Sequence, residues 1–169
     1  MALEIFVTVG TQLPFDRLVG AVDAWAARRP EASVFAQIGD GRAPHHAAHA
    51  RDLHPADFAG RLANADVIVA HAGMGTILTA LDLGKPVLVM PRRADLGEHR
   101  NDHQLATVAR LSHLEALRAV ADEDALAAAL DGFTARGAGA HAPDHGLSPA
   151  RQDLVRAVAA FVAGGPQPC

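Results

Sequence analysis

Short apolar runs alternate with amphipathic segments along most of the chain. Two runs, 67–70 and 87–90, contain only apolar residues, which is typical of strands buried on both faces of a parallel sheet. The full set of predicted strands is 5–9, 33–38, 67–70, 87–90 and 116–119. The predicted helices are 15–28, 57–62, 76–84, 101–111 and one that begins at 122–124. This alternation predicts an α/β fold: a single Rossmann-like domain with a mostly parallel sheet and helices on both faces.

Apolar side chains recur at helical spacing in three of the predicted helices, and these positions are expected to face the core. The stripe is clearest in helix 15–28. The acidic residues at 122–124 favour a helix start there, because they oppose the positive end of the helix dipole. The predicted core positions of the helices are Leu18, Val19, Val22, Trp25, Leu105, Val108, Ala109, Leu126 and Leu130.

Three segments lack a regular pattern. Segment 42–56 is polar, contains prolines and carries four histidines, so it is predicted to be a surface loop. Segment 132–147 is rich in glycine, alanine and histidine and is predicted to be a mobile loop. A last helix is expected over 148–162, followed by a frayed tail at 164–169. No linker separates two domains, so residues 1–169 are predicted to form one domain.

The turn after the apolar run 67–70 is the first candidate site. It contains Gly73 and Gly75, which allow positive φ and let the backbone come close to a ligand, and Thr76, whose hydroxyl is expected to be free to bind. Free amide groups and the positive end of the helix dipole meet at such a turn, which favours a phosphate. Two glycines are a weak signal alone, because many strand-to-helix turns need them for packing.

A second polar cluster, 92–104, follows the next predicted strand. In open α/β sheets ligands bind beyond the carboxyl ends of the strands, where both this cluster and the glycine turn lie. Together they favour a sugar nucleotide: the turn 73–76 would hold the diphosphate, and Gly10 and Thr11 would add donors. The alternative for the polar residues is a capped, solvated helix start. The side chains expected to bind sugar hydroxyls are Glu98, Asp102 and Gln104.

Composition narrows the function classes. Of the 169 residues, 50% are hydrophobic and 20% are charged, as in a globular domain. A net charge of −4 gives no support for nucleic-acid binding through a broad basic face. The single cysteine, Cys169, has no partner for an internal disulfide, which fits a reducing cytoplasm. No segment reaches the roughly 20 apolar residues of a membrane span, so a soluble cytoplasmic protein is predicted.

A metal site and a dinucleotide site fit the sequence poorly. His99 and His103 would share a helix face, but no His-Glu-x-x-His or Cys-x-x-Cys spacing is present, so no metal site is predicted. These two histidines are expected to bind a ligand, and those of segment 42–56 to be solvated. A dinucleotide fingerprint would place three glycines after the first strand. Gly10 is followed there by Thr-Gln-Leu-Pro, so no nucleotide cofactor is predicted.

Four stretches carry a resemblance: Val-Thr-Val-Gly-Thr at 7–11, Ala-Asp-Val-Ile-Val-Ala-His-Ala-Gly-Met-Gly-Thr at 65–76, Gly-Lys-Pro at 84–86 and Asn-Asp-His-Gln at 101–104. Together they resemble the carboxyl-terminal, donor-binding half of GT-B glycosyltransferases of family 28, over the chain to about Leu130. The chain looks most like the stand-alone catalytic subunits of split UDP-sugar transferases. Those are the eukaryotic subunit that extends lipid-linked oligosaccharide and its bacterial counterparts in exopolysaccharide synthesis.

The resemblance implies half of a GT-B fold and an inverting hexosyltransferase that needs no metal or other cofactor. The chain would bind a UDP-sugar and transfer the sugar to a lipid-linked or polysaccharide acceptor. A GT-B enzyme works between two Rossmann-like domains, so the acceptor half is expected on a membrane-anchored partner subunit. That partner would hold the chain at the inner membrane face, and a homodimer is a further expectation for the isolated chain. The alternatives are a nucleotide-sugar-binding or regulatory subunit without turnover, and a scaffold whose glycine turn serves packing only.

The resemblance also suggests roles for individual residues. His71 is the candidate catalytic base in this chain, although a base from the partner is favoured, because a base must first meet the bound acceptor. In many relatives a carboxylate one turn into the glycine-turn helix binds the ribose, and Thr79 stands at that position here. Thr11, with Arg92 or Arg93, is expected to assist the departure of the diphosphate. The predicted substrate-binding residues are Gly10, Thr11, Gln12, Gly73, Met74, Gly75, Thr76, Thr79, Arg92, Arg93, Glu98, His99, Asp102, His103 and Gln104.

Overall fold

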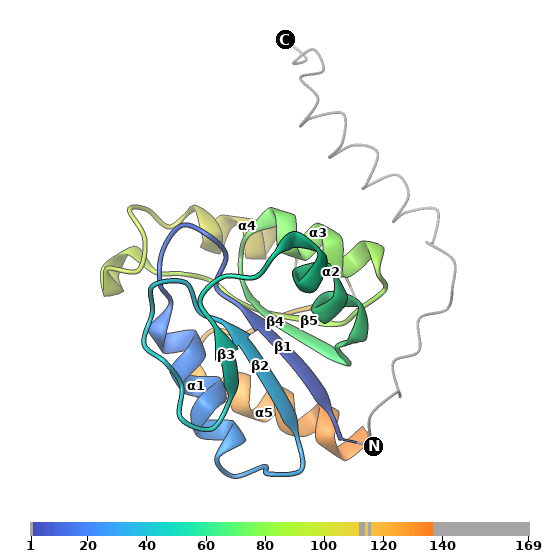
Figure 1. The fold of residues 1–169 in the computed structure, drawn as a ribbon. Helices are drawn as coiled ribbons and strands as arrows, with labels where there is room; N and C mark the ends of the chain where they lie inside the picture. The colour runs from blue at the N-terminus through green and yellow to red at the C-terminus, as the bar shows by residue number, and fades with distance from the viewer. Residues whose placement is uncertain (1, 112–113, 115, 137–169) are drawn as a thin grey trace.

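The computed structural model describes residues 2–111, 114 and 116–136, and it contains one six-stranded, all-parallel sheet (Figure 1). The strand order is β3-β2-β1-β4-β5-β6. The strands are β1 (Glu4–Thr8), β2 (Ser33–Gln37), β3 (Ala48–Ala50), β4 (Val67–His71), β5 (Val87–Met90) and β6 (Leu117–Ala119). The helices are α1 (Asp16–Ala26), α2 (Pro55–Asn64), α3 (Met74–Asp82), the 3-10 helix η1 (Ala94–Leu96), α4 (His103–Leu111) and α5 (Glu123–Arg136). The predicted Rossmann-like α/β fold is confirmed.

The strand order reverses between β1 and β4. The chain moves outward from β1 to β3, crosses back, and continues outward on the other side as β4, β5 and β6. β1 and β4 pair in register from Ile5 opposite Val67 to Thr8 opposite Ala70, so their carboxyl ends lie side by side. A crevice forms at such a point, because the connections from the two strands leave toward opposite faces of the sheet.

Helices cover both faces of the sheet. α1 and α5 pack on one face, and α2, α3 and α4 lie on the other (Figure 1). β4 and β5 lie between these layers, and their residues 67–70 and 87–90 are all 0% exposed. This double burial is the physical reason why the two runs contain no polar residue. The predicted core positions that are buried are Leu18, Val19, Val22, Trp25, Leu126 and Leu130.

Two carboxylates on α1 fasten the connection between β2 and β3. Asp23 is 9% exposed and accepts hydrogen bonds from the amides of residues 45–47 at 2.9, 2.7 and 3.0 Å. Asp16, seven residues earlier on the same side of the helix, accepts from the Arg42 amide at 2.9 Å. No helix intervenes between β2 and β3, and these bonds tie their connection to α1 instead.

The structure corrects the prediction for segment 42–56. Its residues 48–50 form β3, which pairs with β2 at the edge of the sheet, and α2 begins at Pro55 instead of at 57. Three residues are too few to display the period-two alternation by which a strand is identified. The four histidines of the segment are exposed, as expected.

The predicted mobile loop at 132–147 is wrong in its first part. α5 continues through Gly132 to Arg136. A glycine costs about 1 kcal/mol in a helix interior, and the burial of Phe133, which is 9% exposed, opposes that cost. Residues 137–147, the helix expected at 148–162 and the tail at 164–169 lie outside the described residues.

The inward face predicted for α4 is also wrong in part. Leu105 is 42% exposed and Ala109 is exposed. The inward stripe consists of Gln104, Val108 and Leu111, at the i, i+4, i+7 spacing of a helix face. Gln104 is a polar residue that packs inward because its side chain bonds to the backbone of Arg92. An apolar pattern does not reveal such a position.

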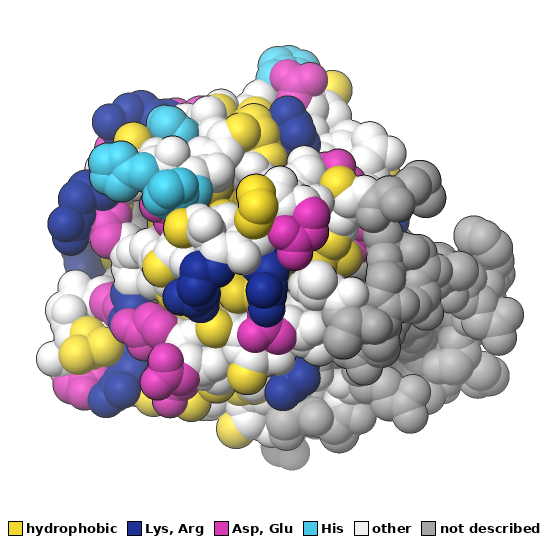
Figure 2. Space-filling model, turned by 90° about the horizontal axis from the view of Figure 1, so that it is seen from below, with side chains coloured by type: hydrophobic (Ala, Val, Ile, Leu, Met, Phe, Trp, Pro, Cys, Tyr) yellow, Lys and Arg dark blue, Asp and Glu magenta, His cyan; other side chains and the backbone are white. Residues whose placement is uncertain are grey.

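Charged side chains are interspersed on the face that carries α1 and α5. Figure 2 shows basic and acidic groups close together there, without one broad basic area. Arg29 and Asp131 form one of the ion pairs, at 2.9 Å. Among the described residues, no helix combines the length and the apolar character that a bilayer span requires.

Candidate functional site

A cavity of about 690 Å³ opens at the carboxyl edge of the sheet. It lies where the turns after β1, β4 and β5 meet the segment that leads into α2. Its volume is within the roughly 300–1,000 Å³ of small-molecule sites. The predicted site residues that line it are Gly10, Thr11, Gln12, His71, Gly73, Met74, Gly75, Thr76, Thr79, Arg92, His99, His103 and Gln104.

The imidazole of His71 shapes the turn between β4 and α3. A Cβ atom on Gly73 would lie 2.2 Å from Nε2 of this ring, and one on Gly10 would lie 2.6 Å from Cε1. Neither Gly73 nor Gly75 adopts the positive φ that glycine allows, since Gly73 has φ −87° and Gly75 is helical. Position 73 requires a glycine only because any side chain there would clash with the ring of His71. Gly10, with φ 77°, is needed for both its conformation and its contact with the ring.

The first turn of α3 faces the cavity. Amides in the first turn of a helix have no partner within that helix, and Met74, Gly75 and Thr76 all line the cavity. Apart from its chain neighbours and its own helix backbone, no atom of the described residues lies within 4 Å of the Cβ position of Gly75, which therefore faces open space. Thr79 donates its hydroxyl to the Gly75 carbonyl at 2.8 Å, so this donor is engaged within the helix. The turn offers amides and the positive end of a dipole to an anion.

A buried polar network holds the start of the turn after β1. Thr8 is 0% exposed, donates to Gln37 Oε1 at 2.8 Å and accepts from the Gly10 amide at 3.2 Å. Gln37 Nε2 donates to the carbonyls of Gly10 and Arg51, at 3.2 and 2.9 Å. These bonds fix the conformation of Gly10, and with it the direction in which the chain leaves β1 toward Thr11.

Arg92 contacts the same turn. It is 2% exposed, and its guanidinium donates to the carbonyl oxygens of Pro14, Leu13 and Val9 at 2.5, 2.6 and 2.8 Å. Its amide donates to Gln104 Oε1 at 3.0 Å. Burial lowers the pKa of Arg92 from its usual value. The sequence analysis expects this side chain to bind the diphosphate. In the structure its guanidinium makes three hydrogen bonds to carbonyl oxygens of the protein.

The imidazole of His71 is neutral at pH 7. Burial lowers its pKa to about 4, and the positive charge of Arg92 acts in the same direction. A hydrogen bond to the backbone of Thr8 acts in the opposite direction but does not outweigh the burial. An imidazole with so low a pKa takes up a proton weakly at neutral pH.

His99 and His103 contribute a second pair of rings to the cavity lining. The rings meet edge to face with centroids 4.6 Å apart. His103 Nδ1 contacts Asn101 Oδ1, while His99 Nδ1 is buried without a partner. Within the described part of the chain, no three His, Cys, Asp or Glu side chains are grouped so that they could hold a metal ion.

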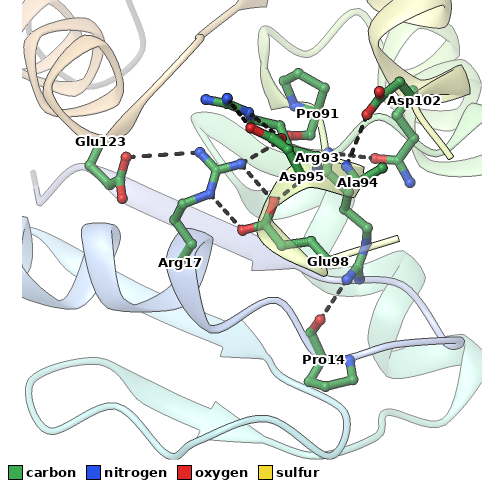
Figure 3. A network of polar contacts seen from close by, with 11 residues as sticks. Pro14, Arg17, Pro91, Arg93, Ala94, Asp95, Glu98, Asp102 and Glu123 are labelled. Atoms are coloured by element: carbon green, nitrogen blue, oxygen red, sulfur yellow. Dashed lines mark hydrogen bonds and ion pairs between the residues drawn. The ribbon is translucent and has the colours of Figure 1, made fainter. Parts of the chain in front are cut away.

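Three predicted binding residues lie outside the cavity lining, because their polar groups are engaged elsewhere (Figure 3). Glu98 accepts from Arg17 Nε and Nη2 at 2.6 and 2.8 Å and from the Arg93 amide at 3.0 Å. The side chain of Arg93 pairs with Asp95, and Asp102 accepts from the first amide of η1 at 2.9 Å. These residues hold the chain after β5 in place, so the structure does not bring them together with the other candidates.

The lining also includes residues outside the predicted set. Thr8 and Gln37 end β1 and β2, so the rule that ligands bind at the carboxyl edge could have pointed to them. Asp52 is the single carboxylate among the described residues that line the cavity, and no motif marks it. The others are Val9, Leu13, Leu53, Pro55, Phe58, Ala72 and Thr107.

Comparison with known proteins identifies the family. Residues 4–141 match the model of the glycosyltransferase family 28 C-terminal domain. The chain belongs to this family. Its fold is similar to the solution structure of ALG13, with a TM-score of 0.60 and 18% identity over 92% of this chain and 94% of that one. It is also similar to MurG from Acinetobacter baumannii, with a TM-score of 0.59 and 20% identity over 94% of this chain.

A third similar structure is the glycotransferase of kitacinnamycin, with a TM-score of 0.60 and 21% identity over 97% of this chain. The chain spans 40% of that glycotransferase and 50% of MurG. A comparison with curated proteins gives no match. The family 28 resemblance of the motifs is thus confirmed, and the solved structures show that the fold is the one expected for half of a GT-B enzyme.

Proposed function

We propose that this family 28 domain is the donor-binding, catalytic subunit of a two-subunit inverting hexosyltransferase. Its donor is a UDP-sugar, and its acceptor is a lipid-linked or polysaccharide hydroxyl. The observation that supports this most directly is the cavity of about 690 Å³ where the first turn of α3 faces the turn after β1. Free helix amides favour phosphate oxygens, and the cavity has room beside them for a nucleoside and a sugar.

The proposed reaction is a displacement at the anomeric carbon. An acceptor hydroxyl oxygen forms a bond to this carbon while the bond to the β-phosphate oxygen breaks on the opposite face. The bonding electron pair leaves with UDP, and the hydroxyl proton passes to a base. Amides at Gly75 and Thr76, with the dipole of α3, stabilise the negative charge that develops on the diphosphate. The hydroxyl of Thr11, which also lines the cavity, is placed to assist.

The base is proposed to come from the partner subunit. His71 is the candidate within this chain, but burial lowers its pKa to about 4. General bases work best with a pKa near the operating pH. The ring of His71 is also wedged between the backbones of Gly10 and Gly73, which favours a structural part in the turn.

The acceptor half is proposed to be a separate, membrane-anchored polypeptide that brings this domain to the cytoplasmic face of the membrane. The similarity to ALG13 spans 94% of that chain, whereas the similarity to MurG spans half of it. The ALG13 structure consists almost entirely of this one domain, and this likeness supports the proposal of a domain that works as a subunit. The carboxyl edge, onto which the cavity opens, would then face the partner, because a GT-B site lies between two domains.

Calorimetry with UDP, UDP-glucose, UDP-glucuronate and UDP-N-acetylglucosamine tests the donor site. We expect UDP to bind the wild-type chain and Gly75→Val to weaken this binding at least tenfold. The Cβ position of Gly75 faces the cavity and meets no neighbouring side chain. The valine side chain would therefore occupy the space proposed for the diphosphate. Thr76→Ala is expected to cost less, because one hydrogen bond contributes about 1 kcal/mol.

Gly20→Val is the matched control. Gly20 is also a helical glycine with no atom within 4 Å of its Cβ position, but it lies on α1 away from the cavity lining. Its UDP affinity should equal that of the wild type. Equal affinities in all variants would show the phosphate assignment to be wrong, and no heat with any nucleotide would favour a scaffold. Sugar transfer that appears on addition of the acceptor-binding subunit separates a catalytic subunit from a regulatory one.

A further inference from the structure

The turn formed by residues 9–14 has little regular structure of its own. It leaves β1 at Gly10 and reaches α1 at Phe15, and Thr11, Gln12 and Leu13 are exposed along it. Yet four of its carbonyl oxygens accept hydrogen bonds from side chains elsewhere in the chain. Gln37 donates to one of them, and the guanidinium of Arg92 donates to the other three.

Arg92 is itself held at two points, its backbone amide and its guanidinium. The amide donates to the side chain of Gln104, a residue that is 5% exposed. The guanidinium lies over the ring of Phe15, with Cζ 4.7 Å from the centroid, and this ring is 1% exposed. A planar fork held by an aromatic face is a geometry that lysine cannot reproduce.

We infer that Arg92 is a positioning residue, which holds the turn 9–14 in the conformation where Thr11 and Gln12 face the first turn of α3. The consequence for ligand binding rests on the proposed function, since the turn is one wall of the UDP site. Without the guanidinium, the carbonyls of Val9, Leu13 and Pro14 lose their donor. Buried or half-buried carbonyls rarely remain unpaired. The turn is therefore expected to shift so that these carbonyls reach solvent, and Thr11 and Gln12 then no longer line the cavity.

The alternative is that Arg92 binds the diphosphate directly. Its Nη2 bonds to two carbonyls and its Nη1 to a third. A phosphate contact would therefore have to be made by the remaining N–H groups or break bonds that exist without ligand. The two roles differ in the ligand-free protein: a positioning residue affects the turn before any nucleotide binds, and a phosphate ligand does not.

Amide hydrogen exchange of the ligand-free chain, followed by UDP calorimetry, separates the two roles. The variants are Arg92→Lys, which keeps the charge but loses the fork, and Arg92→Met, which keeps the apolar stem. We expect exchange of the two hydrogen-bonded amides of this turn, those of Val9 and Gly10, to be at least tenfold faster in both variants, and UDP to bind about tenfold more weakly. Unchanged exchange in this turn would overturn the inference, and retained affinity in Arg92→Lys with loss in Arg92→Met would indicate a direct charge contact.

Asp23→Asn is the control for general loss of stability. Asp23 is also a buried side chain that bonds to three backbone groups of a loop, but residues 45–47 do not line the cavity. We expect it to lower the melting temperature and to leave both exchange in 9–14 and UDP affinity unchanged. If Asp23→Asn weakens UDP as much as Arg92→Met does, Arg92 is only structural. If the wild type binds no UDP, the proposed function fails, while the exchange result still decides whether Arg92 holds the turn.

Discussion

Gly73→Ala is predicted to destabilise the fold through a single contact, that with His71. Gly73 has φ −87° and ψ 125°, an extended conformation that any residue adopts. The backbone is therefore not strained by alanine, and the lower entropy of the unfolded chain favours alanine by about 0.4–1 kcal/mol. Against this, the new Cβ would lie 2.2 Å from Nε2 and 2.7 Å from Cε1 of His71. The ring is also wedged against Gly10 and cannot swing away without displacing the other turn.

Overpacking of this kind costs about 1–3 kcal/mol, so Gly73→Ala should lower the free energy of unfolding by about 1–2 kcal/mol. Urea denaturation of Gly73→Ala, His71→Ala and the double variant measures the coupling. Since His71→Ala removes the clashing ring, the double variant should be more stable than the sum of the two losses predicts, by about 1 kcal/mol or more.

Gly75→Ala is the matched control in the same turn. Its Cβ meets no atom within 4 Å, and alanine is favoured over glycine in a helix by up to about 1 kcal/mol. It should leave stability unchanged or raise it, with no coupling to His71→Ala. Losses at Gly73 and His71 that add within about 0.5 kcal/mol would refute the reasoning, because the two sites would then act independently.

Two pH dependences follow from the buried titratable groups. Burial, aided by Arg92, lowers the pKa of His71 to about 4, whereas the unfolded side chain titrates near 6.5. The unfolded state therefore gains a proton first, so stability is complete above about pH 6.5 and falls toward pH 4, by at most about 3 kcal/mol. His71→Gln should flatten this decline in urea titrations at pH 7, 5.5 and 4, and an unaltered slope would contradict the assignment. For Asp23, burial raises the pKa, but three amide bonds outweigh it and the net pKa is below its usual value. This carboxylate stabilises the fold above about pH 4 and loses that effect as the pH falls further. The stability difference between wild type and Asp23→Asn should thus shrink between pH 7 and pH 3, and a constant difference would show that the charge of Asp23 is irrelevant.

Much of the fold was predictable because a strand that is buried on both faces consists only of apolar residues, and such a run can be recognised in the sequence. Residues 67–70 and 87–90 are wholly apolar because helices cover both sides of β4 and β5. The elements that were not predicted contain no such apolar run. β3 is a three-residue edge strand, and α5 passes through Gly132 because Phe133 is buried beyond it.

The candidate site was predictable to the level of segments, and less so for single side chains. The glycine turn, the turn after β1 and the cluster after β5 meet as expected, because parallel strands end at the same edge. Glu98 is a polar residue in the correct segment, yet it bonds to Arg17 from α1 and does not line the cavity. Lys85 of the Gly-Lys-Pro motif lies just before β5, and its Nζ donates to the Ala65 carbonyl at 2.9 Å. This contact joins the segments that lead into β4 and β5, so the motif has a structural role.

The sequence by itself determined the alternation of strands and helices, the family, and the position of the glycine turn between β4 and α3, because these depend on local patterns of side-chain type. Only the tertiary structure decided what each polar side chain binds. Arg92 and Gln104 pack inward since their hydrogen-bond partners lie in other segments: carbonyls of 9–14 for the arginine, and the Arg92 amide for the glutamine. Most buried polar groups are paired, and the partner is set by the packing of segments that are distant in the chain.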